Sequence, residues 1–458
     1  MFEHKANDKT GLRIIIVGCG KVGRTLTEQL SKEGHDITII DTNAVRVQET
    51  TNLHDVMGII GNGASYSVQM EAGIEDTDLI IAVTNSLLCC TIATQVGNCA
   101  AIARVRNPDY SKEVSYLREK LGLALIINPE LEAAKETARM LYLPTALEIN
   151  TFAHGEAELI KFKVPAHNIL DGITVANLSQ NIFSNLLVCA VERENNVYIP
   201  SGDFKINAGD IISFVSHREN ARKFLNKIGF NTKQVKQTMI IGGGRAAYYL
   251  AKDLLSMGIS VKIIELNKAR CEELSILLPE AIIINGDGTD EALLKEEGIS
   301  NAQSFVALTG IDEENILLTL YARRVSTAKV ITKINRITFR EVISQLDLGS
   351  VIYPKYITSE TILGYVRAKT NSKNSNIETL YHMFDQNVEA IEFRISEDTE
   401  LNDIPLKDLK LKDNLLISFI NRNGDIIIPS GQDCIKTGDT VMIFTTHTGF
   451  NDIRDILA

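Results

Sequence analysis

A glycine-rich segment close to the start of the chain has the spacing of a dinucleotide-binding loop. Gly18, Gly20 and Gly23 follow the apolar run 13–17 and open a predicted helix, and Asp41 ends the second predicted strand. The first glycine permits a tight turn, the second lets the backbone approach a pyrophosphate, and the third lets the helix pack against the strand. The free N–H groups at the helix N-terminus then face the phosphates. This combination predicts a nucleotide site.

The acidic residue after the second strand limits which nucleotide can bind. The Asp41 carboxylate can accept hydrogen bonds from both hydroxyls of a ribose, whereas it would repel a 2′-phosphate. NAD(H) or an adenosine nucleotide is therefore favoured over NADP(H). A glycine turn that only packs a helix is the alternative interpretation of the same residues.

A second glycine loop lies 224 residues further along the chain. Gly242, Gly244 and Ala247 follow the apolar run 239–241, and Glu265 takes the place of the acid. Alanine is permitted at the third position, but it and the longer acid are two departures from the first loop. A second nucleotide site is thus predicted from a less complete pattern.

The two loops belong to a repeat that covers the whole chain. Residues 126–129 match 351–354 at an offset of 225. Further along, residues 197–202 match 426–431 at an offset of 229, and both runs end in Ile-Pro-Ser-Gly. An offset that stays this constant indicates a tandem duplication.

Each copy has two parts with different patterns of apolar residues. The first part alternates short β-branched runs with helical periods, such as Val22, Leu26 and Leu30, which predicts a Rossmann-like doubly wound parallel sheet. The second part has short alternating strands and turns, which predicts a small α+β module. The expected fold class is α/β, with four domains: 11–145, 150–230, 236–370 and 376–458.

Polar residues in the loops and after the third strands could also contact a nucleotide. Lys21 and Arg245 occupy the same position in the two glycine loops, where a basic side chain can reach a phosphate or remain solvated. Asn62 and Asp287 follow the third predicted strands, an edge that lies near the adenosine in such sheets. An ordinary turn would place Asn62 and Asp287 in the same way.

Two arginines end the fifth predicted strand. Arg104 and Arg106 alternate on one face and could clamp phosphates. A salt bridge at a domain interface is the competing role. The second copy has Lys333 and Arg336 in the matching run, a weaker version of the same pattern.

Composition and charge exclude several classes of function. The 47 Lys and Arg against 58 Asp and Glu give a net charge of −11, which disfavours non-specific nucleic-acid binding. No apolar run approaches the roughly 20 residues that span a bilayer, and the polar start does not resemble a secretory signal. Seven cysteines without CxxC spacing indicate reduced thiols rather than a metal site. We therefore expect a cytoplasmic protein without membrane insertion or a bound metal.

The first loop and two later runs resemble the TrkA family of Trk potassium-uptake regulators. The later runs are residues 103–110 and 121–133, and the resemblance extends over essentially the whole chain in family order. In that family the Rossmann parts are RCK (TrkA-N) domains and the smaller parts are TrkA-C domains. The resemblance implies a cytoplasmic subunit, peripheral at the inner face of the plasma membrane, that binds a Trk-type membrane potassium channel or transporter subunit.

The resemblance also implies an assembly and its ligands. Four tandem chains would form a homotetramer, a gating ring of eight RCK units, in which NAD(H) and ADP/ATP change the shape of the ring and control K⁺ flux. Thr84 and Thr309 would line the pockets at the ends of the fourth strands. The implied nucleotide-binding residues are Gly18, Cys19, Gly20, Lys21, Val22, Gly23, Asp41, Asn62, Thr84 and Arg104 in the first copy, and Gly242, Gly244, Arg245, Ala247, Glu265, Asp287 and Thr309 in the second.

The two copies differ after the fourth predicted strand. The second copy carries at 312–315 the Asp-Glu-x-Asn segment that family members usually have, whereas the first copy reads Thr-Asn-Ser at 84–86. The first copy thus lacks about four residues, roughly one helical turn. We expect either a remodelled site or a helix with a weaker cap in the first copy.

Other functions are compatible with parts of this pattern. An RCK-type regulator of a different potassium channel or exporter would share the fold, and the direction of K⁺ flux would separate it from a Trk regulator. An NAD-dependent oxidoreductase is disfavoured because each Rossmann part lacks a large substrate domain and the motifs contain no catalytic pair of histidine and acid. A redox role for Cys19 is disfavoured too, because a small residue is acceptable in the loop without one. We therefore expect a regulatory protein and not an enzyme.

Overall fold

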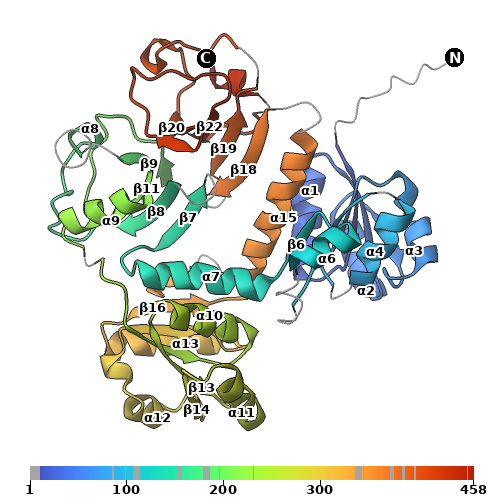
Figure 1. Cartoon of the computed structure of the whole chain (residues 1–458), viewed down its shortest axis with the longest axis horizontal. Helices are drawn as coiled ribbons and strands as arrows, with labels where there is room; N and C mark the ends of the chain where they lie inside the picture. Colours follow the sequence, from blue (N-terminus) through green and yellow to red (C-terminus); the bar gives the residue numbers. More distant parts are fainter. Residues whose placement is uncertain are drawn as a thin grey trace. The chain divides into compact units, whose positions relative to one another are not determined.

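The computed structural model describes most of the chain and divides it into two compact units. The first unit contains residues up to Ala133 together with Tyr353–Val366, and the second contains Ala134–Ile352 and Arg367–Ala458. Figure 1 shows the elements along the sequence. The described residues are 11–84, 87–97, 99–106, 114–152, 157–178, 186–194, 196–230, 232–335, 343, 345–371, 376–383, 387–396, 399–450 and 452–458.

The first unit is built on a parallel sheet with the strand order β3-β2-β1-β4-β5-β6. Its central strands are continuous runs of Ile, Leu and Val that are buried on both faces, as is typical of a sheet covered by helices. The strands are β1 (Arg13–Val17), β2 (Asp36–Asp41), β3 (Met57–Ile60), β4 (Leu79–Ala82), β5 (Ala100–Arg104) and β6 (Leu125–Ile127). The helices between them are α1 (Lys21–Lys32), α2 (Ala44–Leu53), α3 (Tyr66–Glu71), α4 (Leu87–Val96) and α6 (Val114–Leu121), with a 3-10 turn η1 (Ile74–Asp76).

The second unit contains a parallel sheet of the same topology, with the order β14-β13-β12-β15-β16-β17. Both sheets have the 3-2-1-4-5-6 order of a Rossmann fold, which confirms the predicted α/β class. The strands are β12 (Gln237–Ile241), β13 (Ser260–Glu265), β14 (Ile282–Asn285), β15 (Ser304–Ala307), β16 (Lys329–Lys333) and β17 (Ser350–Ile352). The helices are α10 (Arg245–Ser256), α11 (Lys268–Leu277), α12 (Glu291–Glu296) and α13 (Asp312–Val325), with a 3-10 turn η4 (Ile299–Asn301).

Helix α15 (Pro354–Asn371) covers the first sheet although its sequence belongs to the second copy. Its residues up to Val366 are part of the first unit. On one face of that sheet, the core that includes Leu26 of α1 is closed by side chains of α15, namely Ile362, Leu363 and Val366. The first Rossmann sheet is therefore completed by a helix from the other repeat.

Helix α7 (Pro129–Tyr142) makes the reciprocal exchange, because its residues from Ala134 onward belong to the second unit. Lys135 of α7 lies beside Asp253 of α10, where its charge partly offsets the rise in the pKa of Asp253 that burial causes. The residues after α7 then lie beside the start of β16, where Lys329 Nζ donates to the Ala146 carbonyl oxygen at 2.5 Å. Each parallel sheet is thus covered by a helix that the other copy encodes.

Two antiparallel five-stranded sheets complete the second unit, with the orders β10-β9-β11-β8-β7 and β18-β19-β22-β20-β21. They share one apolar core, in which Phe152 contacts Tyr381 edge to face with ring centroids 5.1 Å apart. The first sheet contains β7 (Glu148–Phe152), β8 (Ala157–Lys163), β9 (Leu186–Arg193), β10 (Asn196–Tyr198) and β11 (Ile211–His217), with helices α8 (Val175–Asn177) and α9 (Arg218–Lys227). The second contains β18 (Ile377–Met383), β19 (Val388–Arg394), β20 (Leu415–Arg422), β21 (Asp425–Ile427) and β22 (Thr440–Thr445), with 3-10 turns η5 (Leu406–Asp408) and η6 (Ile453–Ile456).

Candidate nucleotide sites

The first glycine loop joins β1 to α1 at the carboxyl edge of the first parallel sheet. Gly18 has a φ of +111°, a conformation that favours glycine, and its N–H donates to the Ile40 carbonyl oxygen at 2.7 Å. A Cβ on Gly23 would lie 1.8 Å from the Gly18 carbonyl oxygen, so α1 can approach the loop only with glycine there. A Cβ on Gly20, the N-cap residue of α1, would meet no atom within 4 Å. The loop is closely packed on its protein side and open at Gly20.

The carboxylate of Asp41 holds the loop from the end of β2. Its Oδ2 accepts a hydrogen bond from the Cys19 N–H at 2.6 Å, and its Oδ1 accepts one from the Asn43 N–H at 2.9 Å. Asn43 in turn caps α2 by accepting a hydrogen bond from the Arg46 N–H. A carboxylate has about four acceptor positions. Two therefore remain for the hydroxyls of a ribose.

The other three residues of the first loop differ in exposure. Cys19 is buried, and burial together with the Asp41 carboxylate raises the pKa of its thiol to about 12. Val22 is buried in the core, so only its backbone can face a ligand. Lys21 is exposed at the first position of α1. The protonated Cys19 thiol is a poor nucleophile, which agrees with the sequence argument against a redox role.

Arg104 lies at the end of β5, beside the end of β4. Its Nη1 donates to the Val83 carbonyl oxygen at 3.3 Å, and its Nε is buried without a hydrogen-bond partner among the described residues. Burial, followed by the neighbouring Arg106, lowers the pKa of the Arg104 guanidinium. Thr84, the next residue after Val83, is exposed at the same edge, with its Cγ2 against Gly18. Asn85, Ser86 and residues 107–113 lie outside the described part of the chain.

Arg106 does not lie free at the site. Its guanidinium forms an ion pair with Glu130 at the start of α7. The salt-bridge role that competed with phosphate binding is therefore the one that Arg106 takes in this structure.

Asn62 and Asp287 form matching turns after β3 and β14. Asn62 Oδ1 accepts a hydrogen bond from the Ala64 N–H at 3.0 Å. Asp287 Oδ1 accepts two, from the N–H and the hydroxyl of Thr289, at 2.8 and 2.7 Å. These hydrogen bonds lower the pKa of Asp287. Both side chains are used locally, as the turn interpretation expects.

The second glycine loop repeats the backbone of the first with one change. Gly242 has a φ of +95°, and its N–H donates to the Ile264 carbonyl oxygen at 2.8 Å. Gly244 is the N-cap residue of α10, where a Cβ would again meet no atom within 4 Å. Ala247 is fully buried at the position of Gly23, so the second loop accommodates the Cβ that the first cannot. Arg245, like Lys21, is exposed at the first helical position.

Glu265 holds the second loop as Asp41 holds the first. Its Oε2 accepts a hydrogen bond from the Gly243 N–H at 2.6 Å, and its Oε1 accepts one from the Asn267 N–H at 2.7 Å. The extra methylene of glutamate therefore leaves the contact intact. Asp41 and Glu265 are equivalent in geometry as well as in sequence.

The segment after β15 ties two strand ends together in the second copy. The buried amide of Asn315 accepts a hydrogen bond from the Thr309 N–H at 2.9 Å and donates to the Lys333 carbonyl oxygen at 2.9 Å. Asp312 Oδ1 accepts hydrogen bonds from the backbone N–H and the side-chain amide of Asn335, at 2.9 and 3.0 Å. Thr309 is thus fixed by the Asp-Glu-x-Asn segment that the sequence singled out.

Among the described residues of the first copy there is no such connection, and its helix is shorter. Helix α4 has 10 residues and α13 has 14, and the four additional residues lie at the N-terminal end of α13. The remaining contact is conserved between the copies: Lys333 Nζ donates to the Leu308 carbonyl oxygen at 2.9 Å, as Arg104 does to Val83. The expected shortening by about one helical turn is therefore present, and it lies directly beside Thr84.

Two arginines that the sequence did not single out stabilise the loops. Arg24 Nε donates to the Cys19 carbonyl oxygen at 3.3 Å, and Arg270 Nε donates to the Gly243 carbonyl oxygen at 2.7 Å. Arg24 lies on α1, whereas Arg270 lies on α11, so the two copies reach the same contact from different helices. No spacing rule would have identified them.

The geometry of the first site fits a dinucleotide. The N-terminus of α1 is open at Gly20, where a pyrophosphate can meet free N–H groups. Asp41 lies at the end of β2, where a Rossmann fold places an acid that can bind a ribose, and the Nε of Arg104, without a partner among the described residues, is a buried donor at the same edge. The second site shares the open N-terminus and the acid, while Lys333 takes the place of Arg104.

Comparison with known families identifies both kinds of domain. The TrkA-N domain family matches residues 14–129 and 238–354, and the TrkA-C domain family matches residues 159–229 and 390–458. The Trk system potassium uptake protein TrkA homolog 1 of Methanosarcina mazei is 30% identical over 455 residues, covering 97% of this chain and 99% of that protein. The Trk system potassium uptake protein TrkA of Haemophilus influenzae is 30% identical over 441 residues, covering 94% and 95%.

Solved structures share the fold at low identity. The GsuK RCK domain superposes with a TM-score of 0.62 at 16% identity, covering 95% of this chain and 93% of that one. The GsuK channel bound to NAD superposes with a TM-score of 0.62 at 16% identity, covering 96% and 77%. Within the residues that the structure describes, no helix has the length and apolar character needed to cross a membrane.

Proposed function

The chain belongs to the TrkA family of Trk potassium-uptake proteins, and we propose that it acts as a nucleotide-sensing regulatory subunit of such a system. In this proposal it binds NAD(H) and ADP/ATP and controls K⁺ flux through a membrane partner. Its relatives are potassium-uptake proteins and channel domains, and it is not an enzyme. In this proposal the chain has the four domains expected from its sequence, at 11–145, 150–230, 236–370 and 376–458.

One observation carries the nucleotide assignment: the same carboxylate-to-loop hydrogen bond occurs in both copies. Asp41 holds the Cys19 N–H and Glu265 holds the Gly243 N–H, each at 2.6 Å, beside a helix N-terminus that is open at Gly20 or Gly244. This arrangement supports the proposal of an anion site beside a ribose acceptor. A turn that served only to pack a helix would need the third glycine but not the acid.

We assign the two sites to the residues that the sequence predicted. Cys19 and Val22 are buried and contribute backbone atoms, whereas Arg104 contributes its side chain. Among the fold relatives, one GsuK structure is bound to NAD and another, with a TM-score of 0.50, is bound to ADP. Those ligands support NAD(H) and ADP/ATP as the candidates for this chain.

The membrane partner follows from the family. The curated relatives are named as Trk system potassium uptake proteins. The protein would act in the cytoplasm as a homotetramer, peripheral to the inner face of the plasma membrane through a Trk-type channel or transporter subunit. It neither inserts into the membrane nor binds nucleic acid in this proposal.

A nucleotide can switch such an assembly only if it binds two conformations with different affinity. In this proposal the two sites can respond separately, because they lie in different compact units of one chain. Occupancy of each site would bias the packing of its own unit. We expect the conformation near Thr84 to respond more readily to a ligand, because α4 is one turn shorter than α13. In the second site Asn315 fixes Thr309 by a hydrogen bond.

The test of nucleotide sensing is calorimetric titration of the full chain with NADH, NAD⁺, ATP and ADP in turn. We expect two sites per chain. Asp41→Ala should remove one and Glu265→Ala the other. Binding of none of the four nucleotides would overturn the proposal, and unchanged stoichiometry in both variants would overturn the site assignment.

The test of regulation is K⁺ flux in vesicles that contain the cognate Trk-type membrane subunit. Added protein should change uptake in a nucleotide-dependent way, and the Asp41→Ala variant should lose part of that dependence. Nucleotide-dependent efflux through a different channel, with no effect on Trk uptake, would instead favour the exporter alternative.

A further inference from the structure

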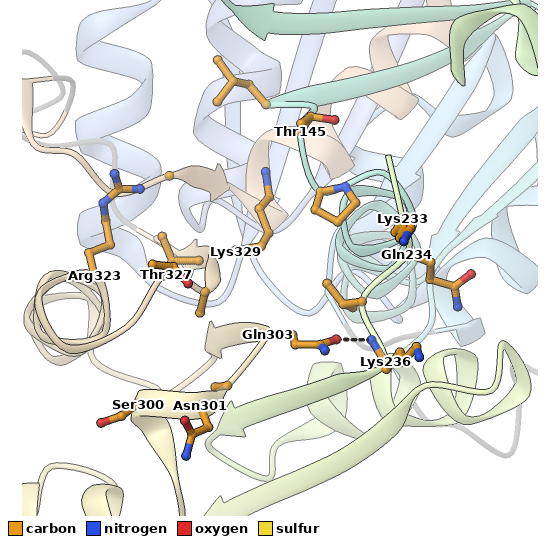
Figure 2. Close-up of a pocket in the computed structure, with 17 residues that line it drawn as sticks. Thr145, Lys233, Gln234, Lys236, Ser300, Asn301, Gln303, Arg323, Thr327 and Lys329 are labelled. Carbon is orange, nitrogen blue, oxygen red and sulfur yellow. Dashed lines mark hydrogen bonds between the residues drawn. The ribbon is translucent and has the colours of Figure 1, made fainter. Parts of the chain in front are cut away.

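A second kind of site lies at the opposite edge of the second parallel sheet. A cavity of about 750 Å³ opens where strands β12, β15, β16 and β17 begin, whereas the nucleotide loop lies where strands end. Its walls come from the second unit: the residues after α7, the connection between the two copies at 233–236, the 3-10 turn η4, the end of α13 and the starts of the strands (Figure 2). The cavity is therefore separate from both glycine loops.

The lining of this cavity is strongly basic. Lys233, Lys236, Arg323 and Lys329 contribute to it, and none of the described residues that line it is acidic. Arg323 forms an ion pair with Asp347, which lies outside the lining and is largely exposed. Burial, followed by the charge of Arg323, lowers the pKa of Lys329 to about 8. The charge of Arg323 thus adds to the effect of burial in disfavouring the ammonium form of Lys329.

A neutral donor in the same wall also lacks a partner. The hydroxyl of Thr145 is buried and forms no hydrogen bond among the described residues. It belongs to the segment that Lys329 Nζ holds through the Ala146 carbonyl oxygen, and Figure 2 shows Lys329 extending toward this segment. An orphaned hydroxyl in a cavity is costly unless a ligand or water satisfies it.

The duplication supplies an internal comparison for the basic residues. Matching backbone hydrogen bonds show which residues correspond. Lys329 N–H donates to the Gln303 carbonyl oxygen, and Ala100 N–H donates to the Asp78 carbonyl oxygen, so Lys329 corresponds to Ala100 and Gln303 to Asp78. Lys236 corresponds to Leu12 in the same way. The Lys236 carbonyl oxygen accepts a hydrogen bond from the first N–H of β13, and the Leu12 carbonyl oxygen accepts one from the first N–H of β2. Arg323 and Thr94 both stand two residues before the ends of their helices, α13 and α4.

The formal charge at these four matched positions therefore differs between the copies. Lys236, Gln303, Arg323 and Lys329 carry a formal charge of +3, whereas Leu12, Asp78, Thr94 and Ala100 carry −1. The Rossmann fold does not require the basic set, because the first copy forms the same sheet without it. Three cations gathered at one edge in one copy alone need an explanation other than folding.

We propose that this cavity binds a small polyanion of the phosphate class, either free pyrophosphate or the phosphate group of a phosphorylated metabolite. Lys236, Arg323 and Lys329 would supply the charge, and Thr145 and Gln303 would supply neutral hydrogen bonds. Because Thr145 lies in the connection between α7 and β7, the anion would fasten that connection to the sheet. The site would thus add a second chemical input to the chain, beyond the nucleotides.

The test is calorimetric titration of the full chain with pyrophosphate and, in a separate arm, with ribose 5-phosphate. The cavity variant is Lys236→Gln with Arg323→Gln. The matched control is Lys252→Gln with Arg324→Gln, which removes the same charge from exposed positions outside the cavity. Any binding of these probes at the glycine loops is the same in both variants, so the difference between them reports the cavity.

We expect the affinity of at least one probe to fall roughly tenfold or more in the cavity variant and to stay near the wild-type value in the control. Loss for both probes would indicate recognition of phosphate groups in general, and loss for ribose 5-phosphate alone would indicate a phosphorylated metabolite. Thr145→Val, which removes no charge, should weaken the same probe several-fold. Equal affinities in the two double variants, or no binding to the wild type, would overturn the proposal. Neither result would bear on nucleotide binding at the loops.

Discussion

The Asp41 carboxylate holds the backbone N–H of Cys19 at 2.6 Å, so the acid that is expected to receive a ribose also fixes the glycine loop. Glu265 makes the same contact with Gly243 at the same distance. The carboxylate is therefore already oriented before a ligand arrives, which lowers the entropic cost of binding. The acid therefore has a structural role in the loop in addition to the ribose-binding role that we propose for it.

Replacing Asp41 with alanine should weaken NADH binding at the first site. The variant loses charge-assisted hydrogen bonds to the ribose that together contribute roughly 1.5–3 kcal/mol, so we expect a loss of roughly 10- to 150-fold in affinity. Calorimetry with NADH measures it. Asp36→Ala, at the exposed opposite end of β2, is the control and should bind normally. An unchanged affinity in Asp41→Ala would show that this acid does not contact the nucleotide.

Alanine at two glycines of the first loop should separate packing from binding. Gly20→Ala should leave thermal stability unchanged, because its Cβ meets no protein atom, but should weaken nucleotide binding by blocking close approach. Gly23→Ala should lower the free energy of unfolding by about 1–3 kcal/mol, because its Cβ would meet the Gly18 carbonyl oxygen at 1.8 Å. Thermal unfolding and NADH titration of both variants test this. Equal effects of the two substitutions would contradict it.

Asn315→Ala should loosen the edge of the second site. The substitution leaves the Thr309 N–H and the Lys333 carbonyl oxygen without their partner, at a cost of about 1–3 kcal/mol for each buried group. Hydrogen exchange should accelerate in the peptide that contains Thr309. Leu317→Ala, at a side chain 67% exposed on the same helix, is the control and should leave exchange there unchanged.

Lys329 should impose a pH dependence on the stability of the second unit. Its pKa is lowered to about 8, below the ordinary value of 10.5, because burial disfavours the ammonium. Between pH 8 and 10.5 the unfolded chain therefore binds more protons than the folded chain at this residue, so its contribution to stability rises with pH. In a buffer without phosphate or other polyanions, the midpoint temperature of Lys329→Met relative to the wild type should fall as pH rises through this window. A constant difference in midpoint temperature would contradict the shift.

The thiols should react selectively with iodoacetamide in the native state. Six of the seven cysteines are buried, and Cys434 is partly exposed. Cys19 combines burial with a pKa of about 12, so it has almost no thiolate at pH 8. Mass spectrometry after brief labelling should find Cys434 modified and Cys19 unmodified. Early modification of Cys19 would reopen the redox role that the sequence disfavoured.

The sequence predicted the parallel sheets because glycine spacing, buried apolar runs and the repeat all depend on local chemistry. Asp312 and Asn315 illustrate the same point: the four-residue difference between the copies was visible in the sequence, and it shortens α4 relative to α13. These features need no knowledge of which segments meet in space.

The exchange of α7 and α15 could not be predicted in this way. The apolar positions of α15, such as Ile362 and Leu363, would suit either of two sheets with the same topology. Which sheet a helix covers depends on the difference in packing energy between two similar sheets, and residue spacing in the sequence does not reveal that difference. The same limit applies to Arg106, whose ion-pair partner Glu130 lies 24 residues away and could not be identified from spacing alone.

The position of α15 also sets an order of events during synthesis. The last strand of the first parallel sheet ends at Ile127, but Ile362, Leu363 and Val366, which close one face of its core, leave the ribosome only after nearly the whole second Rossmann sheet. Until then the part of this face that α15 covers stays exposed, although α1 already packs beside it. Premature termination between these points would leave that face open to solvent, to chaperones or to another nascent chain, so the tandem arrangement makes completion of the polypeptide a condition for burying its first core.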